Sequence, residues 1–88
     1  MIFVDDAIWP FRDRVWAHLI SDESYDELHD FAERLGLPRR AFHLDHYDVP
    51  EELRGNALAL GATAVSAREV VRRLQASGLR RKRGELGS

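Results

Sequence analysis

The amino-acid sequence predicts a small α/β domain, a mostly parallel four-stranded sheet with three helices in the order β-β-α-β-α-β-α. Short apolar runs of strand length alternate with longer segments in which apolar residues recur every three or four positions, as on one face of a helix. Polar residues that cap helix starts and glycines that end helices separate these segments. We expect one domain over residues 1–79, followed by a basic, disordered tail over residues 80–88.

Two strands are expected before the first helix. Residues 2–4 are apolar without alternation, which is typical of a strand buried on both faces, and the run stops at Asp5. Residues 15–20 form the second strand, in which His18 lies between large apolar neighbours. Residues 7–14 are expected to form a loop, whose aromatic residues cover the core or line a pocket. Because this loop contains no crossover helix, the first strand could pair in either direction.

Capping boxes mark the first and the last helix. Ser24 with Glu27, and Ser66 with Glu69, have the spacing at which the two side chains satisfy free backbone groups at a helix start. Each of these helices ends at a glycine followed by a leucine, which is typical of a left-handed C-terminal turn. These two helices are therefore the most clearly bounded elements of the chain.

A third strand, a second helix and a fourth strand fill the middle of the chain. We expect the third strand near residues 41–47, with Asp48 as the cap of the helix that follows. That helix ends at Gly61, and residues 62–65 form the fourth strand. Strands that alternate with helices pair in parallel through right-handed crossovers, so we expect the second, third and fourth strands to be parallel.

The composition excludes several classes of protein. The 88 residues are 44% apolar and 32% charged, which indicates a globular chain, and the absence of cysteine excludes disulfides and thiolate metal sites. The net charge of −2 does not favour a dedicated nucleic-acid or membrane-surface protein. No apolar run reaches the roughly 18 residues of a membrane span, and the acidic start is unlike a signal peptide. We therefore expect a cytoplasmic bacterial protein, in which Gly87 and Ser88 could be a cloning remnant.

The densest group of polar side chains lies in residues 43–48, His-Leu-Asp-His-Tyr-Asp. In open parallel sheets, ligands bind at the carboxyl ends of the strands. The predicted topology brings several polar residues to that edge, where the starts of the following helices can hold a phosphate. The candidate catalytic residues are His18, His46 and Asp48, and the candidate ligand-binding residues are Asp5, Asp6, Tyr47, Arg54, Ser66 and Arg68.

Three kinds of site fit these residues. A divalent metal such as magnesium, manganese or zinc could be held by Asp5, His46 and Asp48, and could activate water against a phosphodiester. Asp6 is a further carboxylate for such a site. Without a metal, His18 or His46 could transfer a proton while an arginine holds an anion. The third interpretation is a hydrogen-bond network without chemistry, in which case the aromatic loop forms a surface for a protein partner.

A set of spaced motifs runs through the chain. They are Val4-Asp5-Asp6-Ala7, Trp16-Ala17-His18-Leu19, Glu27-Leu28-His29, Leu35-Gly36-Leu37-Pro38-Arg39, His46-Tyr47-Asp48-Val49, Gly61-Ala62 and Val65-Ser66-Ala67-Arg68-Glu69. In this order, from about Ile2 to Leu79, they resemble a bacterial and phage family of small proteins, the domain of unknown function 4031. The resemblance implies no activity. It does imply that the following candidates lie in characteristic motifs of the family: Asp5, His18, His46, Tyr47, Asp48, Arg54 and Arg68.

These observations lead to one expected function and one alternative. We expect binding, with hydrolysis as its extension, of a nucleotide or other phosphate-bearing ligand at the His/Asp/Arg cluster, as in a hydrolase or phosphoesterase. A divalent metal is the cofactor to test, and nucleic acid is a less favoured partner. The alternative is a non-catalytic protein-interaction module whose polar cluster is structural. A shared pocket requires the cluster to lie within about 12 Å.

Overall fold

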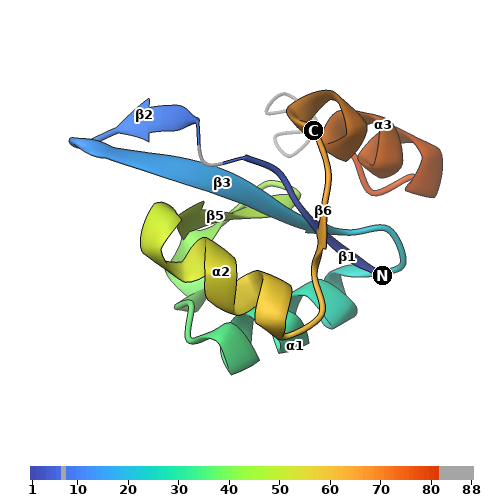
Figure 1. Ribbon diagram of the computed structural model, residues 1–88. Helices are drawn as coiled ribbons and strands as arrows, with labels where there is room; N and C mark the ends of the chain where they lie inside the picture. The colour runs from blue at the N-terminus through green and yellow to red at the C-terminus, as the bar shows by residue number, and fades with distance from the viewer. Residues whose placement is uncertain (7, 82–88) are drawn as a thin grey trace.

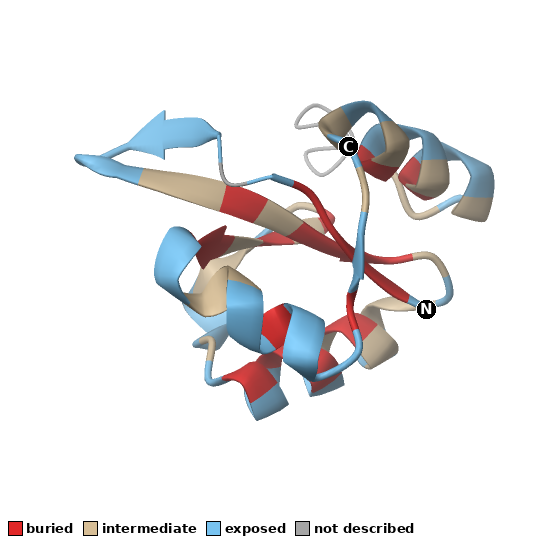
Figure 2. Cartoon of the chain, in the orientation of Figure 1, coloured by how far each residue is buried: buried red, intermediate tan, exposed pale blue. Residues whose placement is uncertain are grey.

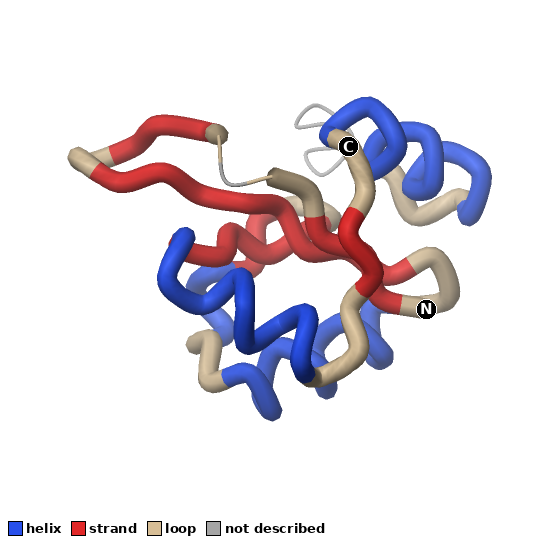
Figure 3. The backbone as a smooth tube through the Cα atoms, in the orientation of Figure 1, coloured by secondary structure: helices blue, strands red, loops and turns tan. Residues whose placement is uncertain are grey.

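A mixed sheet lies at the centre of the structure, with α1 and α2 on one face and α3 on the other (Figures 1 and 3). The computed structural model describes residues 1–6 and 8–81. Its six strands have the order β4-β5-β3-β1-β6, and β2 pairs with β3 beyond the end of β1. The mixed α/β class and the three α-helices match the prediction from the sequence. In chain order the elements are β1 (Ile2–Val4), β2 (Trp9–Phe11), β3 (Arg14–Ser21), α1 (Tyr25–Leu35), the 3₁₀ helix η1 (Arg39–Ala41), β4 (Phe42–His43), β5 (His46–Pro50), α2 (Glu51–Ala59), β6 (Thr63–Ala64) and α3 (Ala67–Ser77).

The sheet is mostly antiparallel, so the predicted parallel arrangement of four strands is wrong. β3 runs antiparallel to β1, β2 and β5, and β4 runs antiparallel to β5. Among the described strands, only β1 and β6 pair in parallel. Two short turns, between β2 and β3 and between β4 and β5, explain much of the difference, because a two-residue turn connects only antiparallel neighbours.

A β-hairpin replaces the loop that we expected over residues 7–14. β2 pairs with the first half of β3, with Trp9 opposite Trp16, while β1 pairs with the second half of the same strand. The hairpin turns at Arg12 and Asp13, whose φ angles of 53° and 62° are those of a type I′ turn. The sequence gives little sign of this turn, because type I′ turns usually carry Asn-Gly or Asp-Gly.

A second turn divides the segment near residues 41–47 that we expected to be one strand. β4 and β5 are joined at Leu44 and Asp45, and Leu44 has a φ of 59°. Leucine rarely adopts a positive φ, so nothing in the sequence marks this turn. As a result, Asp48 lies within β5 and does not cap α2, whose N-cap is Pro50 without a side-chain hydrogen bond.

The first and the last α-helix begin and end where the capping signals predict. The hydroxyl oxygens of Ser24 and Ser66 accept the backbone N–H groups of Glu27 and Glu69, each at 3.1 Å. A glycine in the left-handed conformation follows each helix, as at Gly36 with a φ of 92°. None of the helices in residues 1–6 and 8–81 has the length and apolar character that a membrane crossing requires.

The helices cover the two faces of the sheet unequally. α1 and α2 bury the face that carries Val4, Leu19 and Val49. On the opposite face, α3 covers one end only, where Phe3 and Ile20 pack against it, and the exposed hairpin extends away from that end (Figures 1 and 2). Because side chains alternate along a strand, the part of this face that α3 leaves uncovered carries residues 14, 16 and 18 of β3 and the even-numbered residues of β5. Several candidate site residues are among them.

Replacing Asp13 by glycine tests the strained hairpin turn. Asp13→Gly is expected to raise the free energy of unfolding by about 0.5–1 kcal/mol, because glycine adopts a φ near 62° without a steric clash. The measurement is equilibrium urea denaturation. The control is Asp30→Gly at an exposed position within α1, which should lower the free energy of unfolding by about 0.5 kcal/mol, through the lower helix propensity of glycine and the lost pair with Arg34. Equal destabilisation by both substitutions would contradict the turn assignment.

Candidate functional site

A buried carboxylate lies at the break between β1 and β2. Asp5 is fully buried, and its Oδ1 accepts the backbone N–H of His18 at 2.6 Å. Its Oδ2 lies 2.9 Å from His18 Nδ1 and accepts the indole N–H of Trp9 at 3.3 Å. The guanidinium Nε of Arg54 donates to the Asp5 carbonyl oxygen at 2.8 Å. These contacts hold the His18 ring through Nδ1, so that Nε2 is the nitrogen left for a ligand.

A second buried carboxylate orients His46. Asp45 Oδ1 lies 2.9 Å from His46 Nδ1. Asp45 Oδ2 accepts the backbone N–H of Arg81 at 2.8 Å and the guanidinium of Arg80 at 3.3 Å. The other ring nitrogen, His46 Nε2, lies 3.3 Å from Asp48 Oδ1. His46 is therefore held in the same way as His18, through Nδ1 and a carboxylate that is inaccessible to solvent.

His18, His46 and Asp48 form a three-residue cluster on the uncovered part of the sheet. His18 and Asp48 are direct cross-strand partners in β3 and β5. The two imidazole rings meet edge to face, with their centroids 4.8 Å apart. One ligand atom from each of the three side chains lies within 4.8 Å of the others. Two imidazoles and a carboxylate at this spacing are a donor set that holds divalent metal ions.

Two carboxylates stabilise the charged form of His46. Burial alone lowers its pKa, but hydrogen bonds to Asp45 and Asp48, together with their negative charges, raise the pKa from its ordinary 6.5 to about 9. Burial raises the pKa of each aspartate, whereas His46 and other positive groups lower it by more, so that both lie below the ordinary 3.8. The imidazole is therefore protonated at neutral pH, and a metal ion at Nε2 would replace a proton.

Several other candidate residues lie outside the cluster. Tyr47 points to the opposite face of the sheet, where its buried hydroxyl bonds to a histidine of α1 at 2.7 Å. Ser66 caps α3, and Arg68 is exposed on that helix. Asp6 is exposed and lies 3.5 Å from Arg54. The sequence predicted that the carboxyl ends of β3 and β5 meet at one edge of the sheet. This prediction is wrong, because the two strands are antiparallel and therefore end at opposite edges.

Asp45 belongs to the site but is not among the residues that the sequence predicts for it. Its neighbour His46 was a candidate, but the burial of Asp45 depends on the turn at Leu44 and on contacts with Arg80 and Arg81. We had assigned both arginines to a disordered tail, and the remainder of that tail, residues 82–88, lies outside the described residues. No local signal in the sequence connects this segment with a turn some 35 residues earlier.

Comparisons with known proteins place the chain in one family. Residues 2–77 match the family model described as "Protein of unknown function (DUF4031)". No curated protein and no solved structure gives a significant match. The matched range contains the three-residue cluster and both carboxylates that orient its histidines.

The raised pKa of His46 predicts a loss of stability at alkaline pH. A group whose pKa is higher in the folded protein than in the unfolded chain stabilises the fold. This contribution is complete at a pH below the unfolded-state pKa, and it disappears as the pH rises through the folded-state pKa. The free energy of unfolding should therefore fall between pH 6.5 and pH 9, by an amount on the order of 2 kcal/mol. Urea denaturation at these two pH values measures the difference.

The His46→Gln variant is the reference for this experiment. Partial burial lowers the pKa of the N-terminal amine, but Glu27 and Asp22 raise it to about 10, so the amine also loses stabilising contacts at alkaline pH. The variant retains that contribution and lacks the one from His46. A fall of the same size in both proteins would show that His46 is not the responsible group.

Proposed function

The chain belongs to the DUF4031 family, whose description assigns no activity, and we propose its function from the cluster of His18, His46 and Asp48. These three residues bind a divalent transition-metal ion. With this ion the protein hydrolyses a phosphate ester in a nucleotide or another phosphate-bearing ligand.

The observation that carries this proposal is the pair of buried carboxylates behind the two histidines. Asp5 and Asp45 each lie 2.9 Å from the Nδ1 of one ring. In metal sites, the ring nitrogen that does not bind the ion commonly donates to a carboxylate, which fixes the tautomer and makes the other nitrogen a stronger ligand. Burying a carboxylate costs free energy unless it is paired. Two such arrangements that converge on a third carboxylate, Asp48, therefore support a role beyond packing.

The donor set agrees with a catalytic rather than a purely structural metal site. Zinc accepts two imidazoles and a carboxylate, and manganese, iron and nickel accept the same atoms. Three protein ligands leave a coordination position for water or substrate. When bound, such an ion supplies a Lewis acid for a phosphoryl oxygen and lowers the pKa of a water molecule. Asp48 is 45% exposed, so the side of the cluster that it borders is accessible to a ligand.

Arg54 extends from α2 to Asp5, the residue whose side chain holds His18. Its Nε is fixed on the carbonyl of Asp5, while its Nη2 faces the exposed carboxylate of Asp6 at 3.5 Å. A guanidinium that is 25% exposed and held in one orientation can attract a phosphate group.

A non-catalytic interaction module is the second candidate function, and one observation favours it. Both nitrogens of His46 already have carboxylate partners, so the cluster is satisfied as a hydrogen-bond network without any ligand. Exposed apolar side chains on the hairpin, such as Phe11 at 61% exposure, would then form the contact surface. The two candidates differ in whether the cluster binds a metal ion.

Metal binding is the first test of the proposed function. Isothermal titration calorimetry with zinc and with manganese should give one site per chain in the wild-type protein. His18→Gln, His46→Gln and Asp48→Asn should each weaken binding by roughly 100-fold or more, because each removes one of three ligands. His43→Gln is the matched control, since His43 is exposed beside His46 and is not one of the three residues. Equal loss in His43→Gln, or no binding by the wild type, would contradict the proposal.

Replacing a carboxylate behind a histidine tests its effect on the bound metal. Asp45→Asn keeps the size of the side chain but removes the charge that faces His46 Nδ1. It should weaken metal binding by about 10- to 100-fold and reduce metal-dependent hydrolysis of bis(p-nitrophenyl) phosphate by a similar factor. Circular dichroism checks that the variant is folded. A folded Asp45→Asn protein with unchanged affinity would show that this carboxylate has only a structural role.

A further inference from the structure

A groove of about 700 Å³ borders the three-residue cluster at the outer edge of β5. β4 pairs only with the start of β5, at His46 and Tyr47, so on the side of β5 away from β3 no described strand pairs with Asp48 and the residues after it. One wall of the groove comes from the hairpin and the other from η1 with the residues before it. Asp48 is the member of the three-residue cluster that lines the groove, so the groove borders the cluster at this carboxylate.

The hairpin wall of the groove is aromatic. Trp9, Phe11 and Trp16 all line it, and the exposed fractions of Trp9 and Phe11 are 43% and 61%. Hydrogen bonds fix both indoles, since Trp9 donates to Asp5 and Trp16 donates to the carbonyl of Phe11 at 2.9 Å. The Trp9 ring also lies 5.0 Å from the ring of His18, between centroids. Rigid aromatic faces of this kind are platforms on which nucleobases stack.

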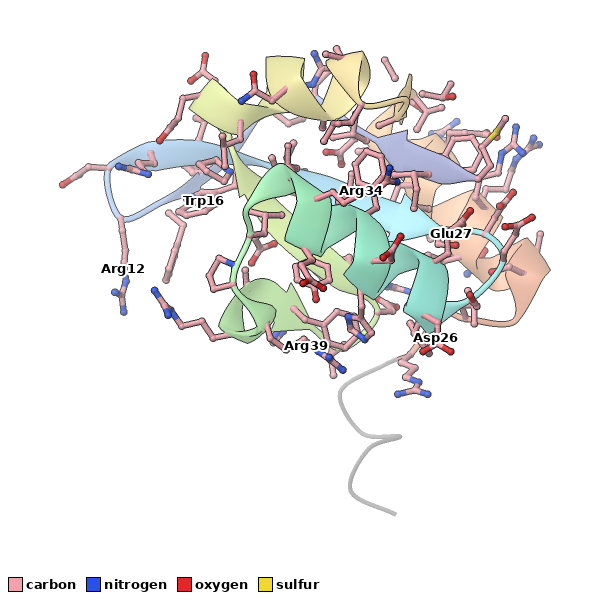
Figure 4. All side chains as sticks on the ribbon, turned by 90° about the horizontal axis from the view of Figure 1, so that it is seen from below. Arg12, Trp16, Asp26, Glu27, Arg34 and Arg39 are labelled. Atoms are coloured by element: carbon pink, nitrogen blue, oxygen red, sulfur yellow. The ribbon has the colours of Figure 1, made fainter. Side chains whose placement is uncertain are left out.

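The same groove carries uncompensated positive charge. Among the described arginines, those without a carboxylate within 4.0 Å are Arg12, Arg39, Arg40, Arg68 and Arg81. Arg12 and Arg40 line the groove from opposite walls, and Arg39 lies next to Arg40 in η1. Figure 4 shows Arg12 and Trp16 on the hairpin and Arg39 on the adjacent segment. The lining of the groove therefore has two arginines against one carboxylate, Asp48, so that it is locally positive in a chain with a net charge of −2.

We propose that this groove binds single-stranded nucleic acid, with bases stacked on the aromatic wall of Trp9, Phe11 and Trp16 and the adjoining phosphate directed toward the cluster at Asp48. Stacking uses the face of any base, so the groove accepts different sequences, and Arg12 and Arg40 contact the sugar-phosphate backbone. The inference deepens the proposed function and rests on it for the hydrolysis of that phosphate, because it names the substrate class. Binding of the strand itself needs no metal ion.

Fluorescence anisotropy with a labelled oligothymidine, in buffer containing EDTA, tests the groove separately from the metal site. The wild type should bind, and an oligomer of the same length with abasic sites should bind roughly tenfold more weakly, because it keeps the phosphates and loses the stacking. Phe11→Ala should show a similar loss. Thymidine monophosphate serves as competitor, and weaker competition by this mononucleotide than by the oligomer is the expected result, since it lacks the further phosphates that the arginines contact.

Matched charge reversals locate the binding surface. Arg40→Glu should weaken binding about tenfold, whereas Arg68→Glu, the same change at an exposed position on α3, should alter it less than about twofold. Equal effects of the two reversals, equal affinity for the abasic oligomer, or no binding of any oligomer would overturn the inference. The metal titration is read independently. Oligomer binding without metal binding refutes the proposed hydrolysis and retains the groove, and metal binding without oligomer binding refutes the groove alone.

Discussion

The buried carboxylate of Asp5 is the interaction on which the sheet and the site both depend. Asp5 lies between the end of β1 and the start of β2. Its Oδ1 accepts the backbone N–H of His18, in place of a backbone carbonyl from a neighbouring strand. Its Oδ2 binds the ring of His18 and the indole of Trp9. A buried charge is tolerated only when several donors surround it, so these partners cannot move independently. One side chain thus connects β3 to the segment between β1 and β2, orients a candidate metal ligand and holds Trp9 in one wall of the groove.

Asp45 orients His46 as Asp5 orients His18, and it also connects the site to the residues that follow α3. The residues after α3 return to the β4–β5 turn, where Arg80 and Arg81 bind the carboxylate that holds His46. Leu44, immediately before Asp45, has a φ of 59°, a conformation that costs a leucine free energy. A buried carboxylate costs free energy unless it is paired, and both of these carboxylates are paired with a histidine. Their positions around His18 and His46 are consistent with selection for a site.

The sequence predicted some elements well because their signals are local. The serine caps and terminal glycines of α1 and α3 involve residues within one or two helical turns, and the structure confirms both helices. The strands were harder, since their partners are distant in the chain. Arg12-Asp13 and Leu44-Asp45 form tight turns without the glycine or asparagine that usually marks them. Because neither turn was predicted, we expected parallel strands where the structure has antiparallel ones.

The sequence by itself determined the residue types of the candidate site, because His18, His46 and Asp48 are conspicuous in a chain with few histidines. It also determined the two capped helices, whose signals need no tertiary context. Only the tertiary structure decided which polar residues meet. Pairing of β3 with β5 placed His18 opposite Asp48, and turned Tyr47 toward the other face. A one-residue change of register would have reversed that outcome, since neighbouring side chains on a strand point to opposite faces.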